Sequence, residues 1–349
     1  MTPAASHTAA AASILLLLAS AGVAGAQNDR VRTRSGAETG EIVKMTALGV
    51  TLRRGSISKE VPVSEIQSVQ FGAEPSELTQ ARVNARNGDY RKALGKLTAL
   101  GGAGGDNPYV KQELAFYLAF CRAKLALLEG DAGAIAAAGR ELNTFRQQGK
   151  QNLHYLESLE LLGDLLAASG RFPQAEQMYA EVARAPFPAY KTRAGVLVGK
   201  SLQSQGKHAE AIARLDAAIK LAGDAPETSP QRRQAMLAKA VSLAATGEVD
   251  RGVDLVQQVL RGADPTEARL LARAYNTLGA CYREGGKAKD ALFAYLHVDL
   301  LFASVPESHA EALYHLTDLW RQAGKPKEAQ EARARLEQRY ASSTWAKKL

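Results

Sequence analysis

The stretch from Leu159 to Val182, LELLGDLLAASGRFPQAEQMYAEV, decides the fold of this 349-residue chain. In its first half, apolar residues recur every three or four positions, which is the spacing of one helix face. Gly170 then interrupts the pattern, and a second helical run follows. Gly163 and Ala175 are small enough to let two antiparallel helices approach closely. The stretch predicts a helical hairpin that cannot bury its apolar surface alone and therefore requires neighbouring copies.

Copies of this hairpin are predicted along most of the chain. A glycine separates the two helical runs of each copy, at intervals between 36 and 42 residues. These glycines are Gly88, Gly130, Gly170, Gly206, Gly247, Gly286 and Gly324. Such regularity predicts a mainly α protein, with an α-solenoid of about seven hairpins over residues 76–349.

The hairpins resemble tetratricopeptide repeats, a family in which small and large residues occupy fixed positions across two helices. A close match is formed by Leu278, Gly279, Tyr282, Gly286, Ala291 and Tyr295. The weakest copy lies around residues 116–142, where an alanine-rich second helix shifts register. The resemblance covers about residues 77–340. It implies that the first helix of each pair lines a concave face on which partner peptides lie.

Residues 29–73 are expected to form a small all-β module, either a barrel of SH3-like or Sm-like size or a curled sheet. Five short segments alternate apolar and polar residues, which is typical of strands with one buried face. The expected core is Ile42, Val50, Leu52, Val61, Val63, Ile66, Val69 and Phe71. A sheet this small is marginally stable alone, so we expect it to pack against the first helices.

Five arginines lie in the same module: Arg30, Arg32, Arg34, Arg53 and Arg54. Two interpretations remain open for them. They form a positive edge, or they are ordinary charges that protect exposed strand edges from pairing with other chains.

Residues 1–26 are expected to be an export signal. An apolar run from Ser13 to Val23 precedes Ala24-Gly25-Ala26, a small-x-small cleavage site. A retained membrane anchor is the alternative, although the run is short for a membrane span. Export would place the protein in the periplasm or cell envelope, and a β segment followed by repeats also resembles a class of exported bacterial proteins.

Residue patterns typical of catalysis, cofactors or metals are not found. The segment Gly195–Ser201 ends in Gly-Lys-Ser as a P-loop does, but it has three rather than four residues between its glycines and should lie inside a helix. His309 and His315 are six positions apart, on different helix faces, and HExxH does not occur. Carboxylates brought together only by folding leave an enzyme with a noncontiguous site as a third hypothesis.

The two cysteines, Cys121 and Cys281, are expected to be buried packing residues. They lie four repeats apart, and in a solenoid each repeat contacts only its neighbours. A disulfide between them is the alternative interpretation.

The primary functional hypothesis is a non-catalytic exported scaffold that binds proteins or peptides on the concave face. By position in the repeats, the residues expected on that face are Lys124, Arg193, Lys200, Gln203, Arg273, Asn276, Arg283, Tyr314 and His315. Several of them are cations or amide donors, which suit a carboxylate or an acidic peptide.

The net charge of +8 comes from dispersed lysines and arginines. A nucleic-acid partner is not expected, for two reasons. The chain is predicted to be exported, and it contains no recognisable nucleic-acid-binding motif. The alternative hypothesis is an envelope assembly factor that uses its charge to associate with anionic polymer or membrane. Neither hypothesis specifies an oligomeric state.

Overall fold

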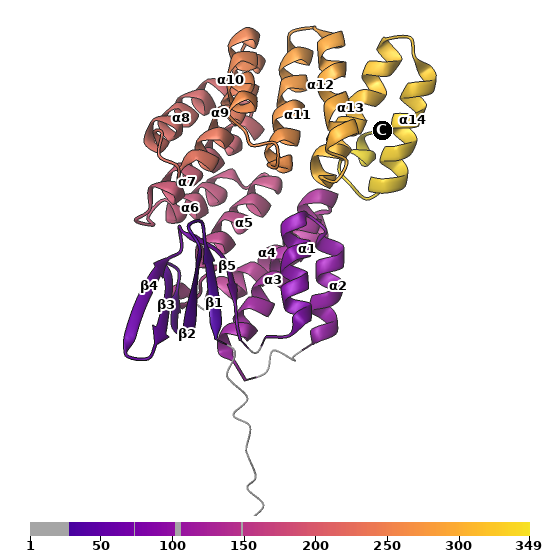
Figure 1. The fold of residues 1–349 in the computed structure, drawn as a ribbon. Coiled ribbons are helices and arrows are strands. Elements are labelled where there is room, and N and C mark those ends of the chain that lie inside the picture. The colour runs from indigo at the N-terminus through magenta and orange to yellow at the C-terminus, as the bar shows by residue number, and fades with distance from the viewer. Residues whose placement is uncertain (1–27, 73, 102–105, 148) are drawn as a thin grey trace, which may run out of the picture.

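The computed structural model describes residues 28–72, 74–101, 106–147 and 149–349 (Figure 1). The predicted export signal, residues 1–26, lies outside these ranges. Within them, five strands come first and fourteen α-helices follow. None of the described helices is both long and apolar enough to cross a membrane.

The strands form one antiparallel sheet with the order β4-β3-β2-β1-β5. They are β1 (Asp29–Thr33), β2 (Ala37–Thr46), β3 (Gly49–Arg54), β4 (Ile57–Pro62) and β5 (Ile66–Gln70). Because β4 and β5 are edge strands, the sheet is open rather than a closed barrel. Register shifts after Arg32 in β1 and after Ile42 in β2 increase its bending.

The predicted β core is confirmed for six residues, which are buried: Ile42, Val50, Leu52, Val61, Val69 and Phe71. Val63 and Ile66 are half-buried against the same cluster, and Val31 and Met45 join it without having been predicted.

The helices pair into seven antiparallel hairpins, as predicted. The first four are α1 (Ser76–Asn87) with α2 (Tyr90–Leu100), α3 (Pro108–Glu129) with α4 (Ala132–Gln147), α5 (Tyr155–Ala168) with α6 (Phe172–Val182), and α7 (Pro188–Ser204) with α8 (His208–Ala222). The last three are α9 (Ser229–Ala245) with α10 (Val249–Arg261), α11 (Ala268–Glu284) with α12 (Ala288–Leu301), and α13 (Pro306–Gln322) with α14 (Pro326–Tyr340). All seven glycines predicted to separate the helices have positive φ, a conformation that side chains disfavour.

A glycine on the first helix and a large side chain on the second hold several hairpins together. A Cβ placed at Gly163 would overlap the Tyr179 ring, and one at Gly279 would lie 2.7 Å from the Tyr295 ring. Gly199 faces Leu215 in the same way. Gly199 is therefore a packing residue inside α7, which removes the P-loop interpretation of residues 195–201.

The first helices of the hairpins form a continuous inner layer. Each odd-numbered helix contacts the next odd-numbered helix, whereas the even-numbered helices pack mainly against the helices that precede and follow them in the chain. The array therefore curves with the odd-numbered helices on its inner side (Figure 1).

The β module shares a hydrophobic cluster with the first repeats, which confirms the expected packing. Val31 and Phe71 of the module lie in one cluster with Leu78 and Leu97 of the first hairpin. The module also reaches later repeats, because Ala47 packs with residues of α5 and α7. Its removal would expose apolar surface on several helices.

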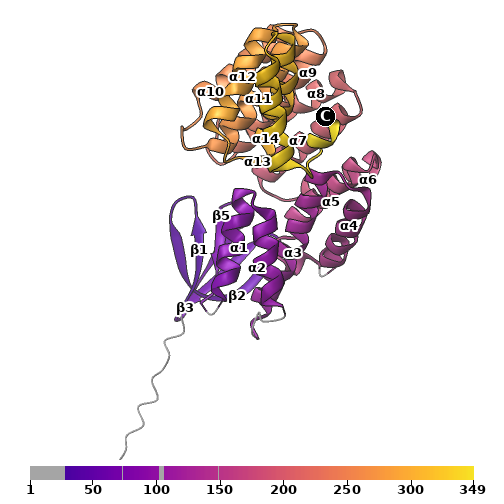
Figure 2. The ribbon, with the colours of Figure 1, turned by 90° about the vertical axis from the view of Figure 1, so that its right-hand side faces the viewer.

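The solenoid closes on itself, because its last repeat contacts its first two. The backbone N–H of Thr344 donates to the carbonyl oxygen of Leu128 at 2.8 Å. The Tyr90 hydroxyl, at the start of α2, donates to Glu307 on α13 at 3.1 Å. We call this junction the seam; Figures 1 and 2 both show the C-terminal helices beside the first hairpins.

Cys121 and Cys281 are both buried and both are free thiols. The packing role is confirmed, and the disulfide interpretation is wrong.

The contact at Gly163 generates a stability prediction. Gly163→Ala should lower the free energy of unfolding by about 1–3 kcal/mol, because the added methyl group overlaps the Tyr179 ring and overpacks the hairpin. Denaturant unfolding followed by circular dichroism measures the change.

The matched control is Gly95→Ala in α2, where an added Cβ meets nothing within 4 Å. This variant should be as stable as the parent or more stable by up to about 1 kcal/mol, because alanine favours helix. Equal effects of the two substitutions would contradict the packing role of Gly163.

Candidate binding surface

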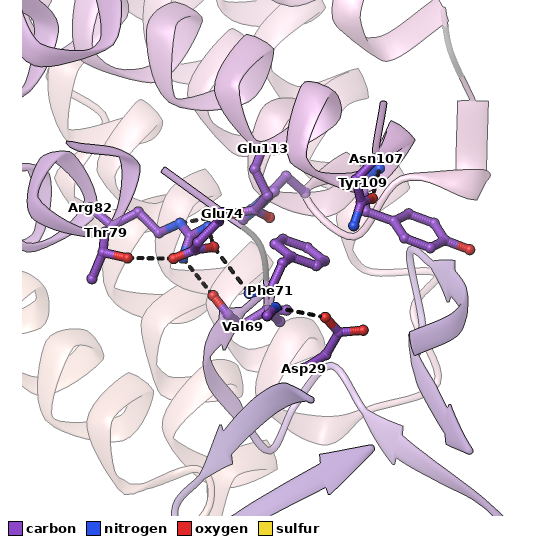
Figure 3. A network of polar contacts seen from close by, with 11 residues as sticks. Asp29, Val69, Phe71, Glu74, Thr79, Arg82, Asn107, Tyr109 and Glu113 are labelled. Atoms are coloured by element: carbon purple, nitrogen blue, oxygen red, sulfur yellow. Dashed lines mark hydrogen bonds and ion pairs between the residues drawn. The ribbon is translucent and has the colours of Figure 1, made fainter. Parts of the chain in front are cut away.

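A buried arginine joins the β module to the inner layer of helices (Figure 3). Arg82 on α1 forms ion pairs with Glu74 at 2.6 Å and with Glu113 on α3 at 3.1 Å. Its guanidinium also donates to the carbonyl oxygen of Val69 on β5 at 2.7 Å. The side chains of all three charged residues are 6% exposed or less, so each charge depends on its partners for stabilisation.

The chain of charges continues from Glu113 to His154 at the start of α5. The ring nitrogens of His154 lie 2.6 Å from Glu113 and 3.1 Å from Glu157, and the ring stacks on Phe116. Burial opposes protonation of His154, but the two carboxylates outweigh it and raise the pKa of His154 to about 9. Burial also opposes ionisation of Glu113, yet the charges of His154 and Arg82 lower its pKa.

The same face of α5 carries two further carboxylates, Glu160 and Asp164. Glu160 forms an ion pair with Arg193 on α7 at 2.6 Å, and Asp164 accepts a hydrogen bond from the Tyr179 hydroxyl at 3.0 Å. Burial raises the pKa of Glu160 to about 7, although Arg193 acts in the opposite direction. One oxygen of Glu160 is buried without a hydrogen-bond partner.

Three more cations lie on the inner layer: Lys124 on α3, Lys200 on α7 and Arg273 on α11. We call them the inner cation cluster. Burial, together with the charges of Arg273, Lys124 and Arg193, lowers the pKa of Lys200 to about 8 despite the nearby Asp164. Within the described part of the chain, no member of the cluster forms an ion pair with a carboxylate.

Two cavities at the seam border this cluster, of about 840 and 830 Å³. Arg273 lines both of them. The first also contains Leu128, Glu311 and Trp345, and the second contains Arg233 and Arg269. At Arg273 the inner surface therefore opens into space large enough for a peptide side chain or a short segment, whereas Lys124 and Lys200 line neither cavity.

Four of the nine residues expected on the concave face, Lys124, Arg193, Lys200 and Arg273, are thus brought together. Two others, Gln203 and Asn276, instead connect neighbouring repeats. The Gln203 amide donates to Ser242 on α9 at 2.8 Å. The Asn276 amide donates to the Ser308 carbonyl oxygen at 2.9 Å and to Glu311 at 3.0 Å. Their hydrogen bonds are used within the fold.

The remaining three expected residues lie near the C-terminus. His315 is only 8% exposed and contacts the rings of Tyr295 and Trp345. Burial, with Arg283 and Lys348 nearby, lowers the pKa of His315 to about 3, so this ring is neutral and does not serve as a cation in the groove. Tyr314 packs on the Trp345 ring, whereas Arg283 is exposed.

Sequence reasoning missed the carboxylates of α5. Glu157, Glu160 and Asp164 follow one another at intervals of three and four residues, which places them on one helix face. That spacing was the available signal. Among the described residues, no group of histidine, cysteine and carboxylate side chains is arranged to hold a metal ion.

Solved structures with the same arrangement of helices are found at low sequence identity. A Rap protein in complex with Competence and Sporulation Factor is 16% identical, with 77% of each chain covered and a TM-score of 0.50. The chain has the tetratricopeptide-repeat fold.

Two further tetratricopeptide-like structures are similar at lower scores. A tetratricopeptide repeat protein from Parabacteroides merdae is 15% identical over 78% of this chain and 96% of that chain, with a TM-score of 0.48. NprR in complex with its cognate peptide NprX is 14% identical over 76% of this chain and 77% of that chain, with a TM-score of 0.45. No protein-family model matches the sequence, and no curated protein matches it significantly.

The elevated pKa of His154 predicts a pH-dependent contribution to stability. The folded-state pKa of about 9 exceeds the ordinary 6.5, so the stabilisation is complete below pH 6.5 and is lost as the pH rises through 9. The difference in unfolding free energy between the parent and His154→Gln should therefore shrink by about 1–3 kcal/mol between pH 6.5 and 9.5.

Leu153→Ala, at the neighbouring buried and uncharged position, serves as control. Its destabilisation should not change over the same range. Stability differences for His154→Gln that are constant with pH would show that the ring is not held protonated by Glu113 and Glu157.

Proposed function

We propose that this protein is a non-catalytic scaffold that binds acidic peptide segments on the inner surface of its solenoid. The observation that carries the proposal is the inner cation cluster. Lys124, Lys200 and Arg273 come from three different repeats and face the same space, while the carboxylates of α5 are occupied by other partners.

The electrostatics of Lys200 favour an anionic partner. Burial, together with the like charges of neighbouring cations, disfavours its protonated form and lowers its pKa to about 8. A carboxylate bound beside Lys200 would offset that penalty and form a charge-assisted hydrogen bond with the ammonium group. A peptide with spaced acidic side chains would reach Lys124 and Arg273 as well.

The class of partner is supported by the kind of protein that shares the fold. The similar Rap protein was solved with Competence and Sporulation Factor bound. In the present chain Arg273 belongs to the inner cation cluster and also lines both seam cavities, so a segment bound beside it could reach either cavity.

We also propose that the scaffold works outside the cytoplasm, in the periplasm or cell envelope. The apolar run before Ala24-Gly25-Ala26 supports this. Export predicts a mature chain that begins after Ala26, and N-terminal sequencing of the native protein checks it.

The peptide hypothesis is tested with the triple variant Lys124→Gln, Lys200→Gln and Arg273→Gln. The probe is a fluorescein-labelled peptide of repeating Glu-Ser-Gly units, and anisotropy measures its affinity. The triple variant should bind about tenfold more weakly or worse, because three charge-assisted contacts are lost. Arg193 is left unchanged because its substitution would strand the buried Glu160 carboxylate.

The matched control is Arg214→Gln, Lys220→Gln and Lys289→Gln, which removes the same charge from exposed positions on α8 and α12. Its affinity should equal that of the parent. If both triple variants lose the same affinity for the peptide, the loss is explained by net charge alone, and the assignment of the peptide site to the inner cation cluster is overturned. The polymer or membrane alternative is tested by sedimenting the protein with envelope fragments. It would be favoured if neither the parent nor the triple variant of the inner cation cluster binds the peptide, while both sediment with the fragments in a salt-sensitive way.

A further inference from the structure

A second cluster of unpaired cations lies outside the inner surface, where the sheet meets the first helix. A pocket of about 180 Å³ lies between these elements. Its lining residues are Arg30 and Arg32 of β1, Ser68, Val69 and Gln70 of β5, and Thr79, Arg82 and Arg86 of α1. We call it the arginine pocket.

The backbone fixes the direction of the two strand arginines. Arg30 and Arg32 flank the buried Val31, so both point to the face of the sheet opposite the core. They lie opposite Gln70 and Ser68 of β5 in the antiparallel register. These four side chains therefore share one patch of the sheet.

The third arginine is held by the helix. Arg86 follows Arg82 by one turn of α1, and Arg82 is anchored by its ion pairs with Glu74 and Glu113. Since both of those carboxylates already contact cations, they do not neutralise the pocket. In the described part of the chain, the side chains of Arg30, Arg32 and Arg86 form no ion pair or hydrogen bond, whereas Arg34 and Arg53 of the same module do.

Protection of a strand edge does not explain Arg30 and Arg32. Edge protection requires charges on an outermost strand, but β1 lies between β2 and β5. Three guanidinium groups around one small pocket repel one another unless an anion lies among them. The pocket also offers the Ser68 hydroxyl and the Gln70 amide as donors.

We propose that the arginine pocket binds a phosphate group. Guanidinium groups present paired N–H donors that match the oxygens of phosphate, and three of them suit a doubly charged anion. A volume of about 180 Å³ accommodates one phosphate group. The group is either free phosphate or the phosphomonoester of a lipid headgroup.

The test uses the full chain and the triple variant Arg30→Gln, Arg32→Gln and Arg86→Gln. Isothermal titration with inorganic phosphate forms one arm, and sedimentation with phosphatidylcholine vesicles containing phosphatidic acid forms the other. The control variant, Arg54→Gln, Arg140→Gln and Arg184→Gln, removes the same charge from exposed positions outside the pocket. Circular dichroism and thermal unfolding confirm that each variant is folded.

We expect the pocket variant to bind the phosphate probe about tenfold more weakly than the parent, or worse. The control variant should bind it as the parent does. This pattern in the titration identifies free phosphate as a ligand, and the same pattern in the vesicle arm alone identifies a lipid headgroup. Equal affinities of the two variants, or no binding of either probe by the parent, would overturn the proposal. Binding of the acidic peptide is unaffected by either result, because the inner cation cluster is a separate set of residues.

Discussion

The ion pairs of Arg82 are the constraint on which the arrangement of the two parts depends. A single buried guanidinium on α1 contacts the segment that follows β5, through Glu74, and the next inner helix, through Glu113. Removing one partner of a buried ion pair typically costs about 3–5 kcal/mol, since the other charge stays buried without compensation. The position of the sheet on the first two repeats is therefore specified by charge as well as by the shared apolar cluster, and small rotations of α1 are penalised.

The same chain of charges determines the electrostatic character of the inner surface. His154 and Arg193 are paired with Glu157 and Glu160 of α5, whereas Asp164 of the same helix accepts a hydrogen bond from the neutral Tyr179 hydroxyl and partly opposes the lowering of the Lys200 pKa. Among the described residues, the inner cation cluster on α3, α7 and α11 forms no ion pair with a carboxylate. The curvature of the helix array brings these three repeats to one space, although their residues are up to 149 positions apart, from 124 to 273. The inner surface thus combines three cations that form no ion pair with an acidic helix that is only partly neutralised.

Local signals in the sequence were enough to predict the hairpins. Gly170 and its equivalents mark turns that need positive φ, and Gly163 marks a close approach of two helices; both are properties of single repeats. The binding residues were harder to predict, because the position of a residue in its repeat does not show whether its side chain contacts the next repeat. Gln203 and Asn276 form hydrogen bonds across repeat boundaries, and His315 is covered by Trp345 from beyond the last hairpin. The open sheet order and the contact between the two ends depend on geometry accumulated over the whole chain, which no local pattern contains.

The seam changes how this array should fold. In an open repeat protein each unit contacts only its neighbours, so the ends fray and unfolding spreads inward from either terminus. Here Tyr90 and Glu307, which are 217 residues apart, are hydrogen-bonded, and the terminal repeats share a boundary. Contacts at such separation pay a large loop-closure entropy before they form. The contact between the first and seventh hairpins forms only after both have been synthesised, and once formed it couples the unfolding of these two repeats.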